Sequence, residues 1–294
     1  MDKLLDVGSY GICLFSLEVL QNFLKREKIK TRKLLQKLQK DKDLYLDTQK
    51  EGIWLPVVGI AAYKYVIKLE GCDEPFDEEW EQKLEYEGFN LEIQDHLCIS
   101  SIGQFYDFDA DNFSGYETSY QTMDGHTNYS QFKYDIPSGK YLVNIKGYAH
   151  RTASRKNPRY GFLFSLVKAD VFEGYKNPRE DELYEFDVSW LTYSKEATIY
   201  WLPEEKDVKN QALDKGEYNA VIQSEEGETC HIYMRFDKTD STKDNLTSKC
   251  RMDNTLHYKN QDDLFYGGAE YTIYEEIRKR GKSVLKEVGR IVIA

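Results

Sequence analysis

The sequence contains no apolar run long enough to cross a membrane as a helix, which requires about 20 predominantly apolar residues. It also lacks a basic leader, because the opening MDKLLDVGSYGICLF places acidic residues where a signal peptide carries positive charge. These absences argue against secretion and against membrane spanning. We therefore expect a cytoplasmic protein with no membrane partner.

Paired metal-binding and catalytic motifs are missing as well. The cysteines are odd in number and form no CxxC pair, which argues against a disulfide framework or a zinc ribbon; they are Cys13, Cys72, Cys98, Cys230 and Cys250. The five histidines form no HExxH or HxH pair, and the GxSxG, P-loop and GxGxxG motifs do not occur. The sequence thus predicts a protein that is not an enzyme, with no catalytic residue, no metal site and no cofactor.

Aromatic side chains, in contrast, are abundant. The 294 residues include 23 Tyr and 14 Phe, which favour the pleated, half-buried surfaces of β-sheets and, in the case of Tyr, protein interfaces. The length fits one large β unit or two domains of ordinary size. A mainly β fold is therefore expected.

The net charge of −11 is unevenly distributed. Residues 25–42 carry nine Lys or Arg against Glu27 and Asp41, a local balance of +7 that leaves −18 for the rest of the chain. A field of that sign repels nucleic acid and membrane surfaces and attracts basic partners. We expect a basic protein as partner and no nucleic acid, and we interpret the basic cluster as the solvated face of a helix.

The start of the chain predicts a strand followed by two helices. Residues 10–15 are apolar and typical of a strand. Ser16 is placed to cap the helix that follows, and Thr31 to cap a second helix with a leucine face. An N-terminal helical segment is therefore expected ahead of the β-rich region.

Strand patterns dominate the middle of the chain. Residues 77–86 (DEEWEQKLEY) are an exception, because Trp80 and Leu84 would share one face of a short helix. Residues 131–149 combine two alternating runs with a Pro-Ser-Gly turn, which predicts a β-hairpin. Residues 160–172 are long and apolar enough for a central strand.

The second half repeats part of this pattern. Residues 212–223 reproduce the order of turn and alternating residues seen in the predicted hairpin, which indicates two related β modules. Strands are expected at 198–201 and 230–236, and a long polar excursion over 237–263. Residues 271–294 have the apolar spacing of a helix, closed by IVIA as a last strand.

These patterns together predict a mainly β (α+β) fold with two β-sandwich-like modules, an N-terminal helical segment and a C-terminal helix. The first domain is expected at 1–157, containing the N-terminal strand, the helices and the first β module. The second is expected at 158–294, containing the second β module, the long polar loop and the C-terminal helix.

One acidic segment, FYDFDADNFSGYE, has a carboxylate spacing that is relevant to metal binding. Asp107, Asp109 and Asp111 alternate along it, as the carboxylates of calcium loops do. The EF-hand pattern then fails, because Asn112 stands where Gly is required and Thr118 where the bidentate Glu is required. We therefore expect a solvated acidic loop.

Three segments resemble known bacterial families. The run YDIPSGKYLVNIKGYA, residues 134–149, is similar to the closing hairpin of small bacterial β-sandwich proteins, among them the competence-associated nuclease inhibitor. The runs DVGSYGICLFSLEVLQNFL and IWLPVVGIAAYKYVIKLEG resemble uncharacterised families found beside polymorphic toxins. The resemblance implies a non-enzymatic binding or immunity role and transfers no functional residue.

We therefore expect an immunity or inhibitor-type protein that neutralises a basic toxin such as a nuclease. The residues predicted to bind it are three carboxylates that imitate phosphates and three tyrosine anchors: Asp107, Asp109, Asp111, Tyr106, Tyr116 and Tyr120. Two alternatives stay open: a carbohydrate-binding or carbohydrate-active β-sandwich, and a structural or accessory subunit buried in an oligomer. The sequence leaves the oligomeric state open.

Overall fold

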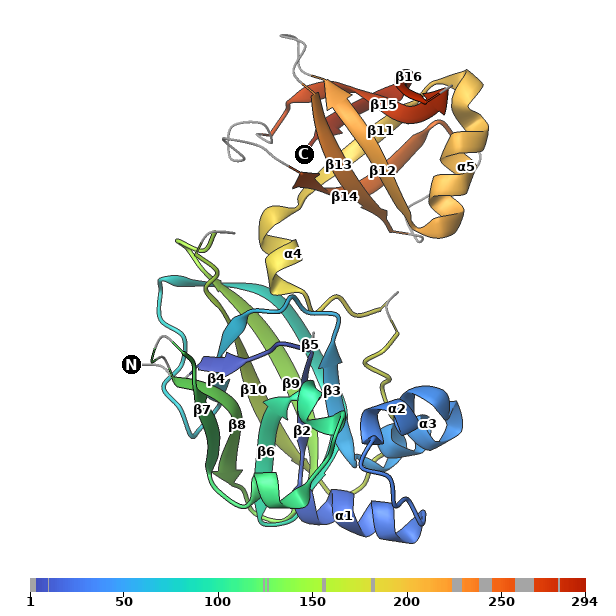
Figure 1. Ribbon diagram of the computed structural model, residues 1–294. Coiled ribbons are helices and arrows are strands. Elements are labelled where there is room, and N and C mark those ends of the chain that lie inside the picture. Colours follow the sequence, from blue (N-terminus) through green and yellow to red (C-terminus); the bar gives the residue numbers. More distant parts are fainter. Residues whose placement is uncertain are drawn as a thin grey trace. The chain divides into compact units, whose positions relative to one another are not determined.

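The structure is a computed structural model that describes residues 4–9, 11–123, 125, 127–154, 157–180, 183–223, 229–237, 245–256, 267–279 and 281–294, with the main chain alone at 254–256. The chain forms two compact units, Met1–Thr192 and Tyr193–Ala294 (Figure 1). Both are built mainly from strands, as expected. The division lies after Thr192 rather than after residue 157, because the strand that begins at Tyr160 pairs within the first unit.

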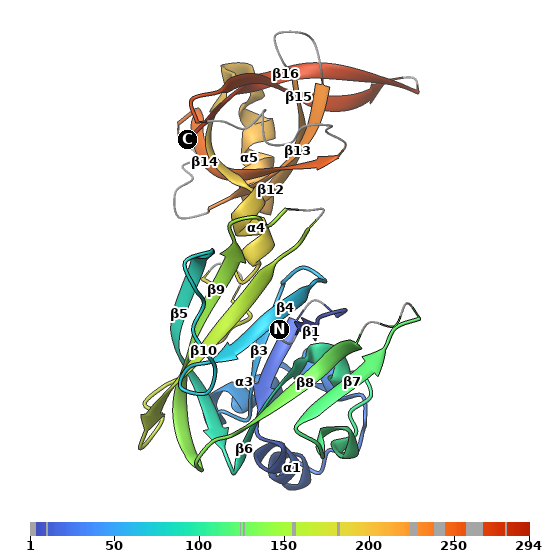
Figure 2. The same cartoon turned by 90° about the vertical axis from the view of Figure 1, so that its left-hand side faces the viewer.

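The first unit, unit 1, is built on one ten-stranded mixed sheet. Its strands are β1 (Leu4–Asp6), β2 (Gly11–Phe15), β3 (Trp54–Val58), β4 (Lys64–Leu69), β5 (Trp80–Ile93), β6 (His96–Ser101), β7 (Glu117–Gln121), β8 (Thr127–Asp135), β9 (Gly139–His150) and β10 (Tyr160–Ala169). They follow the order β3-β2-β6-β8-β1-β4-β10-β9-β5, and β7 pairs with β8 outside this path. In Figure 2, β7 lies at the margin of the sheet beside β8.

The sheet curls so that its two ends approach each other. The amide of Glu92 in β5 donates to the carbonyl of Gly52, which lies two residues before β3, at 2.7 Å. Buried rings pack across the central strands, with Tyr65 of β4 lying 6.1 Å from Tyr160 and 5.4 Å from Phe162 of β10. Unit 1 is therefore a barrel-like sheet and not the sandwich that the sequence predicted.

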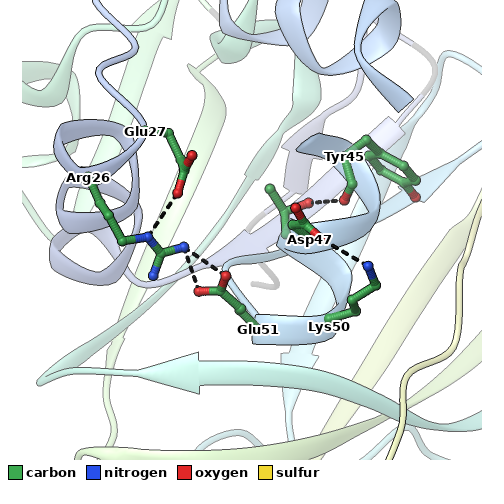
Figure 3. A network of polar contacts seen from close by, with 7 residues as sticks. Arg26, Glu27, Tyr45, Asp47, Lys50 and Glu51 are labelled. Atoms are coloured by element: carbon green, nitrogen blue, oxygen red, sulfur yellow. Dashed lines mark hydrogen bonds and ion pairs between the residues drawn. The ribbon is translucent and has the colours of Figure 1, made fainter. Parts of the chain in front are cut away.

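A layer of helices covers β2, β3 and β6. Its members are α1 (Leu17–Arg26), α2 (Leu34–Lys40), α3 (Lys42–Glu51), η1 (Ile102–Phe105) and η2 (Ala110–Phe113). A further short helix, α4 (Val188–Tyr193), lies at the end of the unit. Beneath this layer the ring of Phe105 stacks on Trp54 at 5.1 Å and meets Phe15 edge-on at 5.2 Å. Figure 3 shows Arg26 at the end of α1 donating two hydrogen bonds of 2.7 Å to Glu51 at the end of α3, which ties the two helices together.

The two predicted N-terminal helices are confirmed. Ser16 occupies the N-cap position of α1 without a side-chain cap hydrogen bond, and Lys33 rather than Thr31 occupies that of α2. The hydroxyl of Ser16 donates to the carbonyl of Gln94 and accepts from the amide of that residue, so it joins α1 to the end of β5. Thr31 accepts from the amide of Lys33, ahead of α2. The leucine face of α2 is buried and its lysines lie outside, as the interpretation of the basic cluster requires.

The helix predicted over 77–86 is wrong, because residues 80–86 belong to β5. Residues four apart share one face of a regular strand as well as of a helix, and in β5 a bulge between Gln82 and Leu84 interrupts this alternation. In β5, Trp80 pairs with His150 and Leu84 with Gly147, both in β9. Pairing with a distant strand thus decides between two structures that the apolar spacing does not distinguish.

The hairpin predicted over 131–149 is also wrong, although both of its strands exist as β8 and β9. β8 pairs with β6, β1 and β7, whereas β9 pairs with β10 and β5. The Pro-Ser-Gly turn at 137–139 therefore links two separate parts of the sheet. The predicted central strand is confirmed as β10, whose first six residues are buried between β4 and β9.

The second unit, unit 2, is a closed antiparallel barrel with the order β11-β14-β13-β12-β15-β16. Its elements are β11 (Lys195–Trp201), η3 (Pro203–Glu205), α5 (Lys206–Lys215), β12 (Glu217–Gln223), β13 (Thr229–Phe236), β14 (Thr247–Leu256), β15 (Glu270–Lys279) and β16 (Lys282–Ile293). Helix α5 contributes Ala212 and Leu213 to the core, together with Trp201 of β11. The second module is thus a barrel and not a sandwich.

The C-terminal helix predicted over 271–294 is wrong, because these residues form the antiparallel pair β15 and β16. The spacing of Ile273 and Ile277, four apart, fits a regular strand as well as a helix, and in β15 a bulge between Ile273 and Tyr274 interrupts the alternation. Gly281 supplies the left-handed conformation, with φ of 78°, at the turn between the two strands.

Of the other predictions for the second half, the two strands are confirmed and the related β modules are not supported. The strands expected at 198–201 and 230–236 are confirmed within β11 and β13. β14 lies inside the polar stretch 237–263, much of which falls outside the described residues. The repeated pattern at 212–223 starts in α5, and the two units differ in topology, so the structure gives no support to related modules.

No helix in the described ranges combines the length and apolarity needed to span a membrane. The cysteines are all free thiols, and Cys72 alone among the five is exposed. Burial raises the pKa of the Cys98 thiol to about 11 and that of Cys250 to about 12, which leaves little reactive thiolate near neutral pH.

We expect one thiol per chain to react rapidly with Ellman's reagent at pH 8, and all five to react after unfolding in guanidinium. The fast thiol is Cys72, since the other four are buried. Cys72→Ser should abolish the fast phase and leave the slow phases unchanged. Two or more rapidly reacting thiols in the native wild-type chain would contradict the burial of the other four cysteines.

Candidate functional site

The predicted acidic loop is bound to the basic segment of the same chain. The guanidinium of Arg32 donates to Asp107 from Nε at 2.8 Å, and its Nη2 lies 3.2 Å from Asp107 and 3.1 Å from Asp109. The carbonyl of Arg32 also accepts from the amide of Phe108 at 2.7 Å. Two of the three predicted carboxylates therefore share one counter-charge, and the loop is less acidic than its sequence implies.

The same aspartates organise the short helix η2. The carboxylate of Asp109 accepts from the amide of Asp111 at 3.1 Å and caps η2, and the carbonyl of Asp111 accepts from the hydroxyl of Ser114 at 2.9 Å. Within the described part of the chain, no group of three or more His, Cys, Asp or Glu is arranged to hold a metal ion. The alternation of the aspartates thus has a structural explanation in the arginine bridge and the cap.

Two of the predicted tyrosines lie together along β7. Thr118 and Tyr120 lie in this strand and Tyr116 directly precedes it, and their alternate positions place the three side chains on one side. We call these three side chains the β7 face. The rings of Tyr116 and Tyr120 are 57% and 50% exposed, although both belong to a sheet whose centre is closely packed. Such exposed aromatic rings are typical of contact surfaces.

Each ring on the β7 face is held in place by a carboxylate. The hydroxyl of Tyr116 donates to Asp135 at 2.9 Å, and the hydroxyl of Tyr120 donates to Asp6. Buried Asn128 donates to the same oxygen of Asp6 at 3.1 Å, which fixes the carboxylate. These hydrogen bonds to carboxylates raise the pKa of both tyrosines. The rings are therefore neutral, exposed and fixed at their polar ends.

A shallow hollow of about 490 Å³ opens beside Tyr116, and its lining residues are Asp95, His96, Asp135, Ile136, Pro137 and Ser138. Nδ1 of His96 lies 2.9 Å from the carboxylate of Asp135, although the two are not aligned as a hydrogen bond. The His96 ring meets Tyr116 edge-on at 6.0 Å. Carboxylates, an imidazole and an aromatic ring thus border one concave surface next to the β7 face.

The charges around the β7 face are mainly negative. Asp6 accepts from Tyr120 and Asn128, and Asp135 accepts from Tyr116 and lies beside His96, whereas Asp107 is paired with a guanidinium, that of Arg32. The ammonium group of Lys133 lies 6.0 Å from the Tyr116 ring and donates to the carbonyl of Ser114. This arrangement suits a cationic group approaching an aromatic surface.

The third predicted anchor, Tyr106, stands apart from the other two in the contacts that the structure gives. It follows η1, is 51% exposed, and precedes Asp107 of the arginine bridge. Sequence reasoning did not identify Asp6 and Asp135, because no local pattern connects them to the tyrosines. The Tyr120–Asp6 contact joins residues 114 positions apart, and only the pairing of the strands brings them together.

Comparisons with protein-family models, with curated proteins and with solved structures found no match for this chain.

Proposed function

We propose that this chain is a non-enzymatic binding protein whose partner is a basic protein, as in immunity or inhibitor proteins directed at a basic toxin such as a nuclease. The observation that carries the proposal is the β7 face, where Tyr116 and Tyr120 are half exposed and fixed by carboxylates. Binding through such rings costs little side-chain entropy, because they are already ordered in the free protein.

The electrostatic part of the proposal moves from the predicted carboxylates to others. Asp107 and Asp109 already share the guanidinium of Arg32, whereas Asp6 and Asp135 lie at the tyrosine hydroxyls and contact no Lys or Arg among the ion pairs of the described residues, Asp135 lying beside the imidazole of His96. Complementary charge raises the association rate of a basic partner, while the aromatic anchors supply affinity. Asp111 stays among the proposed contacts, because its side chain is exposed and makes no ion pair with the described residues.

The carbohydrate alternative requires a groove in which carboxylates lie beside tryptophan rings. The hollow beside Tyr116 has two carboxylates, Asp95 and Asp135, but its lining includes no tryptophan. Its imidazole and aliphatic walls are better suited to a protein side chain than to a sugar ring. The geometry therefore favours the protein-binding proposal over the carbohydrate one.

The proposal is tested by capture of partners from a native lysate at low and then moderate salt, followed by titration of the recovered protein against variants. We expect a basic partner whose affinity falls as salt rises. Tyr116→Ala and Tyr120→Ala should each weaken it by about 30-fold, the effect of losing an anchor worth about 2 kcal/mol. Asp135→Lys should weaken it further, mainly through a slower association rate.

Two matched variants control this experiment. Tyr175→Ala removes another tyrosine of unit 1, 42% exposed and away from β7 in the chain, and should leave affinity unchanged. Asp107→Asn should have less effect than Asp135→Asn, because Arg32 already neutralises Asp107. Equal affinities for the wild type and the two β7-face variants would refute the proposed site, and an acidic partner would refute the proposed chemistry.

A further inference from the structure

Three strands of unit 1, β3, β5 and β7, pair on one side only in the described part of the sheet. The free side of β5 is covered by the connection that follows β10. The side chain of Asn90 donates to the carbonyl of Gly174 at 2.7 Å, and Lys176 donates to the carbonyl of Glu87 at 2.6 Å. The hydroxyl of Tyr86 accepts from the amide of Glu185 at 3.0 Å. This edge is therefore occupied by the chain itself.

The edge at β3 is protected in a different way. Pro56 lies in the middle of this strand and provides no amide for a further strand. The strand is buried over its first four residues, and Gly52 just before it is hydrogen-bonded to Glu92 of β5. Natural sheets use such covers and prolines to prevent pairing with other chains.

The third edge, β7, has neither protection. Its sequence, ETSYQ, contains no proline and no lysine, and four of its five residues are exposed. β8 is the one described strand that pairs with it. An exposed edge strand of this kind is a template for an added strand. The contrast with β3 and β5 makes β7 the edge of unit 1 that is available to another chain.

The geometry points to β-strand addition at β7: an extended, lysine- or arginine-rich segment of the partner pairs with the outer edge of this strand. The inference rests on the proposed function and deepens it, since it names the structure of the partner segment. Added main-chain hydrogen bonds supply affinity, and alternate side chains of the segment reach the β7 face.

Charge complementarity selects a basic segment. Exposed carboxylates of Asp111 and Asp135 and the partly exposed carboxylate of Asp6 lie along or beside β7 and β8. Two lysines lie in the same region: Lys133 is 6.0 Å from the Tyr116 ring, and Lys64 of β4 pairs in register with Asp6. A second copy of this chain is a poorer occupant, because its own β7, ETSYQ, has no lysine or arginine to place against these carboxylates. Lysines at alternate positions of an added strand would instead face carboxylates and tyrosine rings.

The test uses three fluorescein-labelled heptapeptides and the full-length protein. The first alternates Lys and Val, the second alternates Glu and Val, and the third alternates Lys and Pro. The third has the charge of the first but does not form a strand, because proline fixes φ and has no amide hydrogen. Binding is measured by anisotropy at low salt, and amide hydrogen exchange is followed in residues 117–121 with and without each peptide.

We expect the Lys-Val peptide to bind at least tenfold more tightly than either control and to slow exchange in residues 117–121. Ser119→Lys should abolish this preference and Ser119→Glu should retain it, since position 119 is exposed on β7. Equal binding of the Lys-Val and Lys-Pro peptides without protection of β7 would overturn strand addition and leave the proposed function standing. Binding of the Glu-Val peptide at least as tight as that of the Lys-Val peptide would overturn both.

Discussion

Phe105→Ala should destabilise unit 1 by about 3–5 kcal/mol, as is typical of removing a fully buried phenylalanine. The ring is 0% exposed and contacts Trp54 at 5.1 Å, Phe15 at 5.2 Å and Phe108 at 5.5 Å between ring centroids. These neighbours lie in β3, in β2 and in the connection between η1 and η2, and they cannot close the cavity without moving the sheet or that connection. The free energy of unfolding of unit 1, measured in guanidinium, provides the test.

The adjacent residue gives a matched control. Tyr106 is 51% exposed, so Tyr106→Ala should change stability by less than about 0.5 kcal/mol. Phe105→Leu keeps the site apolar and should fall between the two, so it remains measurable if the alanine variant does not fold. Similar losses for Tyr106→Ala and Phe105→Ala would show that the aromatic cluster beneath the helices is not the core described here.

The position of many strands could be predicted from the sequence, but the partner of each strand could not. Alternation along β8 and β9 identifies both strands, and the Pro-Ser-Gly turn joins them as predicted. Their pairing with β6 and β10 depends on residues that lie far away in the chain. A turn sequence predicts that the chain changes direction. It does not predict that the two strands it connects pair with each other, because each can pair with other strands instead.

The helix predictions failed where the apolar residues are four apart. Trp80 and Leu84, like Ile273 and Ile277, satisfy the helical period and also the strand period of two. The helices that were predicted correctly have additional leucines three residues apart, such as Leu17 with Leu20 and Leu35 with Leu38. A spacing of three fits a helix face and places residues on opposite faces of a regular strand, so it favours a helix. It does not decide the structure by itself, because Leu285 and Val288 are also three apart and lie in β16.

In the candidate site, as in the sheet, features set by neighbouring residues could be predicted and contacts between distant residues could not. The exposure of Tyr116 and Tyr120 agrees with the polar residues that surround them in the sequence, although their role in binding stays a prediction. The pairing of Asp107 with Arg32 joins residues 75 positions apart, and no local pattern reveals it. The two side chains stay exposed, at 57% for Arg32 and 73% for Asp107, but a partner meets them as an ion pair and not as a separate carboxylate.

Gly289→Ala should destabilise unit 2 by about 3 kcal/mol, the upper part of the range for overpacking. Gly289 lies in β16 opposite Trp201 of β11, at the pair of strands that closes the barrel. A Cβ atom at this position would overlap the carbonyl oxygen of Tyr200 and lie 3.1 Å from the Cα of Trp201. Because these are main-chain atoms, β11 and β16 must separate before the methyl group fits, and the hydrogen bonds that close the barrel weaken.

Hydrogen exchange resolved by peptide measures this effect in each unit separately. Gly289→Ala should accelerate exchange in β11 and β16, while exchange in β9 and β10 of unit 1 stays unchanged, because the two units have separate cores. Ser283→Ala is the matched control, since it alters an exposed position of the same strand and should leave both units unaffected. Equal acceleration of exchange in both units would mean that the two units unfold together. Unchanged exchange in β11 and β16 would mean that the barrel accommodates the methyl group, and that its strands are less closely packed at Trp201 than the pairing indicates.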